Sequence, residues 1–185
     1  ILARSLGMPA VVGLEVATSL INGGDLLILD GETGELVINP TEGVSHSFLE
    51  RKRRIKSMER EVLKYASLPA ETRDGVRVRL QANIEMVDEI PSVKMHGAEG
   101  IGLYRTEILY LNRKDLPTEE EHFQTYRRIA ESIYPAPATI RTLDIGGDKF
   151  LPDYSKDNEM NPAMGLRAIR FSIKETEIFK TQLRG

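Results

Sequence analysis

The chain has 185 residues, enough for one domain or two small ones with a real hydrophobic core. Its 25 Lys and Arg residues nearly balance 28 Asp and Glu residues, and the net charge of −3 argues against nucleic acid or an anionic membrane surface as a partner. The sequence contains no Cys, which excludes disulfides and thiolate chemistry, and no apolar run approaches the ~20 residues that span a bilayer, so we expect a cytoplasmic protein.

Residues 10–44 are predicted to form a compact β-rich segment. A short strand is expected at 10–13. Two further strands, at 25–30 and 35–39, flank a short Gly-containing connection of the kind that joins hairpin strands. The continuous apolar run Leu26–Leu29 suggests that its strand is buried on both faces.

A charged helix is predicted over residues 45–67. Its apolar residues are spaced by threes, fours and sevens and form one narrow stripe: Phe48, Ile55, Met58, Val62 and Tyr65. The basic residues around Arg53 are typical of a nucleic-acid arm, but glutamates interleave with them, so a solvated connecting helix is favoured. The sequence Leu68-Pro-Ala70 then marks a boundary.

Beyond residue 70 the pattern alternates between strands and helices. Strands are predicted at 76–83, 100–103 and 138–143. Helices are predicted at 86–95, interrupted at Pro91, at 118–134, and within 162–184. Thr118 and Glu121 have the spacing of a capping box, which supports the second helix. Successive β-α units imply an α/β fold with a parallel sheet and right-handed crossovers.

Arginines follow the strands of this segment. Arg105 and Arg141 each stand where a short apolar strand gives way to polar or glycine-rich sequence, and Arg167 lies further along the chain. The ends of strands are where α/β folds display site residues. A guanidinium offers a planar fork of donors and keeps its charge, which suits phosphate and carboxylate groups. The three arginines therefore suggest a doubly charged anion as ligand.

The same arginines are also compatible with structural ion pairs. Arg141 could pair with Asp144, and Arg105 with Glu107. For each arginine taken alone, the sequence leaves the two interpretations open. Their shared location at strand ends favours an anion site.

A glycine-rich turn is predicted after the third strand of this segment. Gly146-Gly-Asp148 lacks the spacing of a P-loop or of a dinucleotide-binding fingerprint, so a tight strand-to-helix turn is favoured. Lys149 follows directly and could reach a phosphate or point into water.

Four stretches of the chain resemble, in order, consecutive motifs of enzyme I of the bacterial sugar phosphotransferase system, the phosphoenolpyruvate-protein phosphotransferases. They are Leu2–Gly13, Gly97–Glu107, Arg141–Lys149 and Asn161–Arg170. Phosphoenolpyruvate (PEP) synthase and pyruvate phosphate dikinase have similar arginines and stay as alternatives, as does a non-catalytic module. Tyr104–Glu107 together with Asp144–Asp148 looks more like enzyme I.

The resemblance implies a fold and an activity. Residues 1–44 would be the C-terminal part of a swivelling phosphohistidine domain, 45–70 a linker helix, and 71–185 the first three or so units of a (β/α)₈ barrel that binds PEP. The family moves the phosphoryl group of PEP to an enzyme histidine and on to a histidine-containing phosphocarrier protein for sugar uptake. Its members are homodimers. We therefore expect this chain to be a piece of a longer protein.

The resemblance also implies residue roles. Arg105 and Arg141 match arginines that hold the substrate, and Arg167 and Lys149 match positions that support its phosphate. The family's acceptor histidine is expected just upstream of Ile1. Its Mg²⁺ ligands and its cysteine proton donor are expected on later strands. We therefore predict that this piece is inactive alone.

The histidines and two of the acidic residues are expected to have structural roles. His46, His96 and His122 do not match the acceptor histidine, and we expect them to have surface or packing roles. Glu107 and Asp144 are expected to be ion-pair partners of the arginines rather than metal ligands.

Overall fold

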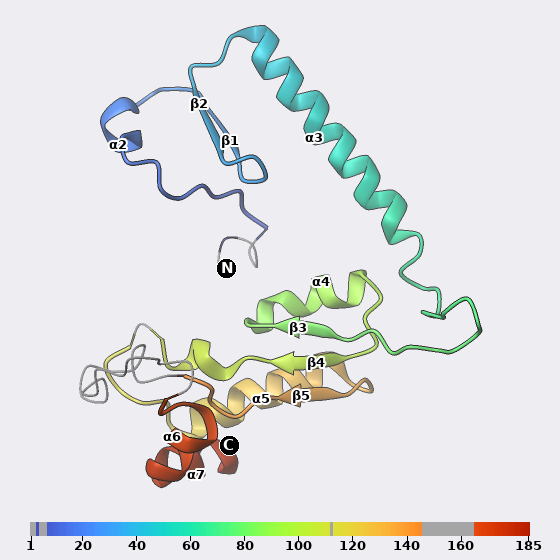
Figure 1. Ribbon diagram of the computed structural model, residues 1–185, viewed down its shortest axis with the longest axis vertical. Helices are drawn as coiled ribbons and strands as arrows, with labels where there is room; N and C mark the ends of the chain where they lie inside the picture. The colour runs from blue at the N-terminus through green and yellow to red at the C-terminus, as the bar shows by residue number, and fades with distance from the viewer. Residues whose placement is uncertain (1–2, 4–6, 112, 146–164) are drawn as a thin grey trace. The chain divides into compact units, whose positions relative to one another are not determined.

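The computed structural model describes residues 3, 7–111, 113–145 and 165–185, which belong to two compact units, Ile1–Ser67 and Leu68–Gly185 (Figure 1). In chain order the helices and strands are α2 (Ala17–Leu20), β1 (Leu27–Asp30), β2 (Glu35–Ile38), α3 (Glu42–Leu63), β3 (Ala82–Ile84), the 3₁₀ helix η1 (Val87–Glu89), α4 (Ile90–Met95), β4 (Ile101–Tyr104), the 3₁₀ helix η2 (Thr106–Leu109), α5 (Glu119–Ile133), β5 (Ala138–Ile140), α6 (Ala168–Lys174) and α7 (Thr176–Arg184). Across the described ranges, none of these helices is long and apolar enough to cross a membrane.

The first unit contains the predicted hairpin. Strands β1 and β2 pair antiparallel, with Leu27 opposite Ile38, and Gly34 in the connection has a φ of +76° that favours glycine. The strand predicted at 10–13 is wrong, because this stretch makes no ladder in the described part of the unit. It passes close to the hairpin turn instead, where a Cβ on Gly31 would lie 3.2 Å from the backbone nitrogen of Ala10.

The prediction that Leu26–Leu29 is buried on both faces is also wrong. Leu26 is 62% exposed and Leu27 is 41% exposed. The run borders an open hollow between the hairpin and α3, which Phe48 and Ile55 also line. A two-stranded sheet with one neighbouring helix cannot cover both faces of a strand, so these side chains stay accessible to water.

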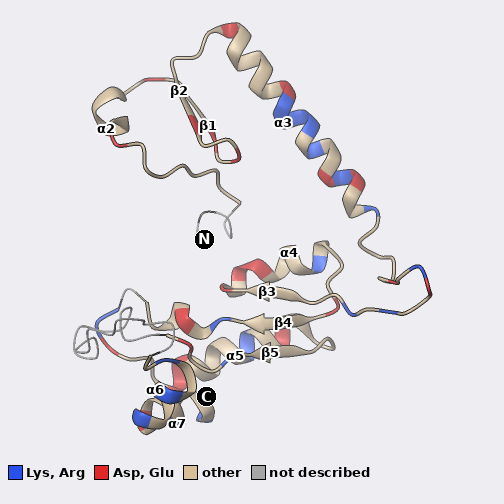
Figure 2. Ribbon diagram, viewed as in Figure 1, with Lys and Arg blue, Asp and Glu red and all other residues tan. Residues whose placement is uncertain are grey.

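Helix α3 begins three residues earlier than predicted, after the N-cap Thr41, whose side chain accepts a hydrogen bond from the backbone nitrogen of Val44. Basic residues, including the run 51–54, and Glu residues both lie along it (Figure 2). Arg51 binds Asp30 at 2.8 Å and Glu32 at 3.1 Å, and this pairing connects the helix to the hairpin. The pKa of Asp30 is lowered, chiefly because the backbone N–H groups of Glu32 and Thr33 donate to its carboxylate.

The second unit is built on a parallel sheet in the order β3-β4-β5, as predicted. Strands β3 and β5 are shorter than expected, whereas β4 has the expected length and begins one residue later. Residues 76–81 precede β3, and Arg77 instead makes an isolated antiparallel bridge with Glu71. The predicted strand is cut short because the chain folds back on itself at this point, where the backbone nitrogen of Thr72 donates to the carbonyl of Val76.

The hydrophobic core lies between the sheet and helices α4 and α5 (Figure 1). Its buried residues are Ile84, Ile90, Val93, Ile101, Tyr104, Ile129 and Ile133. Burial of each large apolar side chain stabilises the fold by roughly 1.5–3 kcal/mol. A second buried cluster, Tyr110, Leu143, Ile145 and Phe171, involves segments that follow β4 and β5 together with α6.

The helices of this unit largely follow the sequence signals. Pro91 lies in the first turn of α4. Backbone N–H groups in the first turn have no partner within the helix, so the N–H that proline lacks costs no helical hydrogen bond. Thr118 and Glu121 form the predicted capping box at the start of α5. The segment 162–184 contains helix as expected, but in its described part there are two short helices, α6 and α7, which meet at Glu175, whose ψ of +63° is not helical.

Gly100 allows β4 to lie against the start of β5. Its φ is +152°, and a Cβ at this position would lie 2.5 Å from the carbonyl oxygen of Pro137. The next residue, Ile101, donates its backbone N–H to that same oxygen at 2.8 Å. Any side chain at residue 100 would therefore disturb the contact that begins this strand pair.

We predict that Gly100→Ala lowers the free energy of unfolding of the second unit by roughly 2 kcal/mol or more, because it adds a steric clash to an unfavourable φ. Gly75→Ala is the matched control: Gly75 also has a positive φ, of +81°, but a Cβ added there would meet no atom within 4 Å beyond its chain neighbours. Urea denaturation followed by circular dichroism measures both. Equal losses for the two variants would contradict the role assigned to the Pro137 contact.

Candidate anion-binding site

Hydrogen bonds just past the strands position two of the predicted arginines. The backbone nitrogen of Arg105, the residue after β4, donates to the carbonyl of Ile84 at 3.0 Å. The backbone nitrogen of Arg141, the residue after β5, donates to the carbonyl of Tyr104 at 3.1 Å. The strands are parallel, so both arginines lie at the same edge of the sheet.

Arg141 is held by two carboxylates. Its Nη2 atom lies 2.7 Å from Oε1 of Glu107, and its Nη1 atom lies 3.4 Å from Oδ2 of Asp144. The backbone nitrogen of Asp144 donates to the same Oε1 of Glu107 at 3.1 Å. The predicted pairing of Arg141 with Asp144 is confirmed, and Glu107 is an additional partner.

Arg105 pairs with a residue that sequence reasoning missed. Its Nη1 atom lies 2.6 Å from Oε1 of Glu85, the residue after β3, so the predicted pairing of Arg105 with Glu107 is wrong. Glu107 lies on η2 and directs its carboxylate to Arg141 instead. Glu85 and Arg105 are 20 residues apart, and only the pairing of β3 with β4 brings them together.

Arg167, which precedes α6, completes the group. Its Nε and Nη2 atoms donate to Oδ1 of Asp144 at 3.0 and 2.9 Å, so Asp144 bridges Arg141 and Arg167. We call this set the arginine cluster: Arg105, Arg141, Arg167, Glu85, Glu107 and Asp144. Three predicted features lie outside the described residues: Lys149, the turn at 146–148 and the first part of the motif 161–170.

The arginine cluster retains capacity to bind an anion. The side chains of Arg105, Arg141 and Arg167 are 42%, 33% and 38% exposed, and each guanidinium has five N–H donors, more than its carboxylate partners use. Among the described residues, Nε of Arg141 and Oε2 of Glu107 are buried without a hydrogen-bond partner. The carboxylates thus orient the guanidinium groups and leave donors for a ligand.

The described residues do not fit a Mg²⁺ site. They contain no group of three or more His, Asp or Glu side chains placed to hold a metal ion. The two carboxylates that contact Arg141, those of Glu107 and Asp144, are engaged with guanidinium and backbone N–H groups. Mg²⁺ prefers several oxygen ligands in near-octahedral geometry, which this arrangement does not offer.

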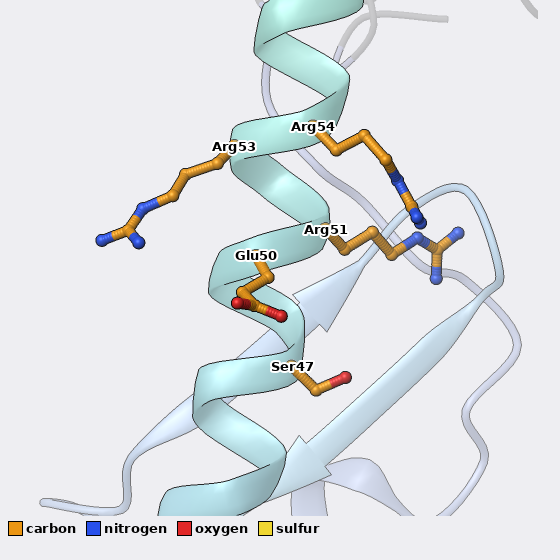
Figure 3. A pocket seen from close by; sticks show the side chains of 5 residues that line it. All are labelled: Ser47, Glu50, Arg51, Arg53 and Arg54. Carbon is orange, nitrogen blue, oxygen red and sulfur yellow. The ribbon is translucent and has the colours of Figure 1, made fainter.

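A basic hollow on α3 is a weaker candidate for the anion site. Its lining residues are Ser47, Glu50, Arg51, Arg53 and Arg54. Figure 3 shows Arg53 extending from the opposite side of the helix to Arg51 and Arg54. Arg51 is already bound to two carboxylates of the hairpin. These arginines do not converge on one point, so we place the anion site at the sheet edge.

Comparison with known proteins identifies the family of the chain. Residues 59–185 match the family described as PEP-utilising enzyme, PEP-binding domain, and residues 1–34 match the mobile domain of PEP-utilising enzymes. The first match covers more than half of the chain. The chain belongs to the PEP-utilising enzymes. The arginine cluster lies within the segment that matches the PEP-binding domain.

Curated relatives extend over the whole chain. The phosphoenolpyruvate-protein phosphotransferases of Geobacillus stearothermophilus and of Bacillus subtilis (strain 168) are each 44% identical to it over 184 residues, and that of Staphylococcus aureus is 42% identical. Each comparison covers 100% of this chain and 32% of the relative. The resemblance seen in the sequence motifs is thereby confirmed, and the chain spans about a third of the length of these relatives.

The three histidines of the chain occupy different environments. His46 and His96 are exposed, whereas His122 on α5 is fully buried. The ring nitrogens Nε2 and Nδ1 of His122 lie 3.1 Å from the hydroxyls of Tyr110 and Tyr126, respectively. Burial lowers the pKa of His122, because the charged imidazolium would lose its hydration. His122 therefore has the packing role that we expected, within a buried polar group.

We predict that His122 makes stability depend on pH. In the unfolded chain its pKa is near 6.5, and in the folded chain it is lower, so only the unfolded state takes up a proton as pH falls through this range. The free energy of unfolding should therefore decrease below about pH 6.5, by at most about 1.4 kcal/mol per pH unit. Urea titrations between about pH 7 and pH 5.5 measure the slope.

His122→Gln is the informative variant, because an amide keeps hydrogen-bonding groups without titrating. Its slope should be flatter than that of the wild type in this pH range. His96→Gln, at an exposed position, is the control for the replacement of a histidine. An unchanged slope for His122→Gln would show that His122 does not cause the pH dependence.

Proposed function

We propose that this chain is part of a phosphoenolpyruvate-protein phosphotransferase and that its arginine cluster binds PEP. The observation that carries the proposal is the position of three arginines: Arg105 and Arg141 directly follow the parallel strands β4 and β5, and Asp144 bridges Arg141 to Arg167. PEP has a phosphate and a carboxylate, and planar guanidinium forks suit both groups. The relatives with this name, 42–44% identical over the whole chain, support it over PEP synthase and pyruvate phosphate dikinase.

Each arginine has a proposed part in binding. Arg105 and Arg141 hold the substrate, and Arg167 and Lys149 support its phosphate. Their carboxylate partners fix the guanidinium planes before the ligand arrives, which reduces the entropy lost on binding. Phosphoryl transfer depends mainly on positioning and on neutralising the phosphate oxygens, and arginines supply both.

The whole protein would supply the rest of the reaction. We propose that β3, β4 and β5 belong to a (β/α)₈ barrel, that residues 1–44 belong to a swivelling phosphohistidine domain, and that residues 45–70 link them. In such a protein the phosphoryl group moves from PEP to a histidine and then to a histidine-containing phosphocarrier protein. The parent would be a cytoplasmic homodimer that uses Mg²⁺, with metal ligands outside the residues described here.

We expect PEP to bind the chain in the millimolar range or tighter, as measured by isothermal titration calorimetry. Arg141→Ala should weaken binding by roughly 10- to 150-fold, because each charge-assisted hydrogen bond contributes about 1.5–3 kcal/mol. Arg127→Ala is the matched control: Arg127 is an exposed arginine on α5 that pairs with Glu131, away from the cluster. Equal effects of the two substitutions, or no heat with the wild type, would contradict the proposed site.

We also expect that the chain takes up no phosphoryl group from radiolabelled PEP. A phosphoryl acceptor must reach the substrate in line with the leaving oxygen, and the buried ring of His122 has both nitrogens occupied by tyrosine hydroxyls. His46 and His96 do not match the acceptor motif of the family. Electrophoresis under alkaline conditions, which preserve phosphohistidine, provides the measurement. A stable phosphohistidine on this chain would overturn the expectation.

A further inference from the structure

Gln182 is a buried polar residue that no sequence motif singled out. It lies on α7 and is only 4% exposed. Its Oε1 atom accepts a hydrogen bond from the backbone nitrogen of Leu143 at 2.9 Å. Its Nε2 atom donates to Oγ1 of Thr106 at 3.0 Å and to the hydroxyl of Tyr126 at 3.3 Å. One side chain therefore contacts three segments that are far apart in the sequence.

The direction of these hydrogen bonds is fixed. A backbone N–H can only donate, so the carbonyl oxygen of Gln182 faces Leu143 and its NH₂ group faces Thr106 and Tyr126. The Thr106 oxygen accepts from Gln182, which leaves the Thr106 O–H to donate to the carbonyl of Arg141 at 3.0 Å. The hydrogen bonds therefore run in one direction, from Gln182 through Thr106 to the backbone carbonyl of Arg141.

The two anchored segments are the ones that carry the arginines. Thr106 lies between Arg105 and Glu107, and Leu143 lies between Arg141 and Asp144. Thr106 is fully buried and Leu143 is 3% exposed. In such a dry environment a hydrogen bond is stronger, and an unmade one is more costly, than at the surface.

The chain of polar groups continues away from the arginine cluster. The Tyr126 hydroxyl accepts from Gln182, so its proton can be donated to Nδ1 of His122, and Nε2–H of His122 then donates to Tyr110. Burial raises the pKa of both tyrosines, so both hydroxyls stay protonated at neutral pH, and that of Tyr126 can keep donating to His122. The network thus supports the orientation of the Gln182 amide from its far side.

We infer that Gln182 is a positioning residue for the anion site. Through Thr106 and Leu143 it holds the segments after β4 and β5 at a fixed separation, so that Arg105 and Arg141 direct their guanidinium groups to one ligand. That the ligand is PEP rests on the proposed function. The geometric role of Gln182 does not.

The first test needs no ligand. Gln182→Met keeps the side-chain length and removes every hydrogen bond of the amide. Compared with the wild-type chain, it should shift the Nε–Hε NMR signal of Arg141 and accelerate hydrogen exchange of the Leu143 amide, with the circular dichroism spectrum retained. Gln124→Met is the matched control, because Gln124 is exposed on α5 and bonds only to Glu120 among the described residues. The control should leave both signals unchanged.

The second test measures PEP affinity. Gln182→Met should weaken PEP binding by roughly 10-fold, because misplacing an arginine would cost about one charge-assisted hydrogen bond to PEP. If Gln182 acts through Thr106, the double variant Gln182→Met, Thr106→Val should bind PEP about as weakly as the weaker single variant, because the two substitutions break the same connection. Simple addition of the two losses would contradict the connection.

Gln182→Glu gives a pH signature that loss of packing would not produce. Its ionised carboxylate keeps the acceptor for Leu143 and cannot donate to Thr106, whereas its protonated form regains one donor. PEP affinity relative to the wild type should therefore recover as pH falls, even if Gln182→Met does not fold. A ratio that is constant with pH would contradict the role.

The outcomes separate this inference from the proposed function. A wild-type chain that gives no heat with PEP contradicts the PEP site, and the Arg141 signal and Leu143 exchange still decide the role of Gln182. If both stay unchanged in folded Gln182→Met, or if its PEP affinity equals that of Gln124→Met, the positioning role is wrong.

Discussion

Parallel pairing of β3, β4 and β5 is the constraint on which the site depends. The ladder continues one residue beyond the strands, through bonds from Arg105 to Ile84 and from Arg141 to Tyr104. Each arginine is thereby fixed beside the end of the neighbouring strand. The carboxylate of Glu85, the residue after β3, then pairs with Arg105, the residue after β4. Without this register, the same side chains would be scattered on separate loops.

Charge balance distinguishes this site from a simple basic patch. Three carboxylates accompany the three arginines, and Asp144 is shared by two of them. These ion pairs are partly exposed, so each contributes little to stability. Their main effect is orientation: they hold long, flexible side chains in a few positions, and a multiply charged ligand then finds donors already in place.

The interior behind the sheet edge is unusually polar for a core. Tyr110, His122, Tyr126, Gln182 and Thr106 form a continuous set of hydrogen bonds that ends at the backbone of Arg141. A buried polar network is stabilising only when its members find partners. In this network each donor faces an acceptor on the next residue of the series. The arginine cluster is thus connected by hydrogen bonds to the buried interior.

Local signals in the sequence predicted local features well. The Gly-containing connection before β2, the capping box of α5 and the short strands that end at Arg105 and Arg141 all depend on neighbouring residues, and the structure contains them. The motifs around the arginines also sufficed to predict the family. By contrast, the length of a strand depends on its partners. This is why β3 begins only at Ala82 and why the stretch at 10–13 forms no strand.

The sequence alone therefore determined which arginines stand at strand ends and which family the chain belongs to, because both are encoded in short contiguous motifs. Tertiary structure decided the partners: Glu85 rather than Glu107 for Arg105, and Gln182 behind Thr106 and Leu143. These contacts join residues that are 20, 39 and 76 positions apart. No periodicity or spacing connects such pairs, since only packing of the sheet against its helices brings them into contact.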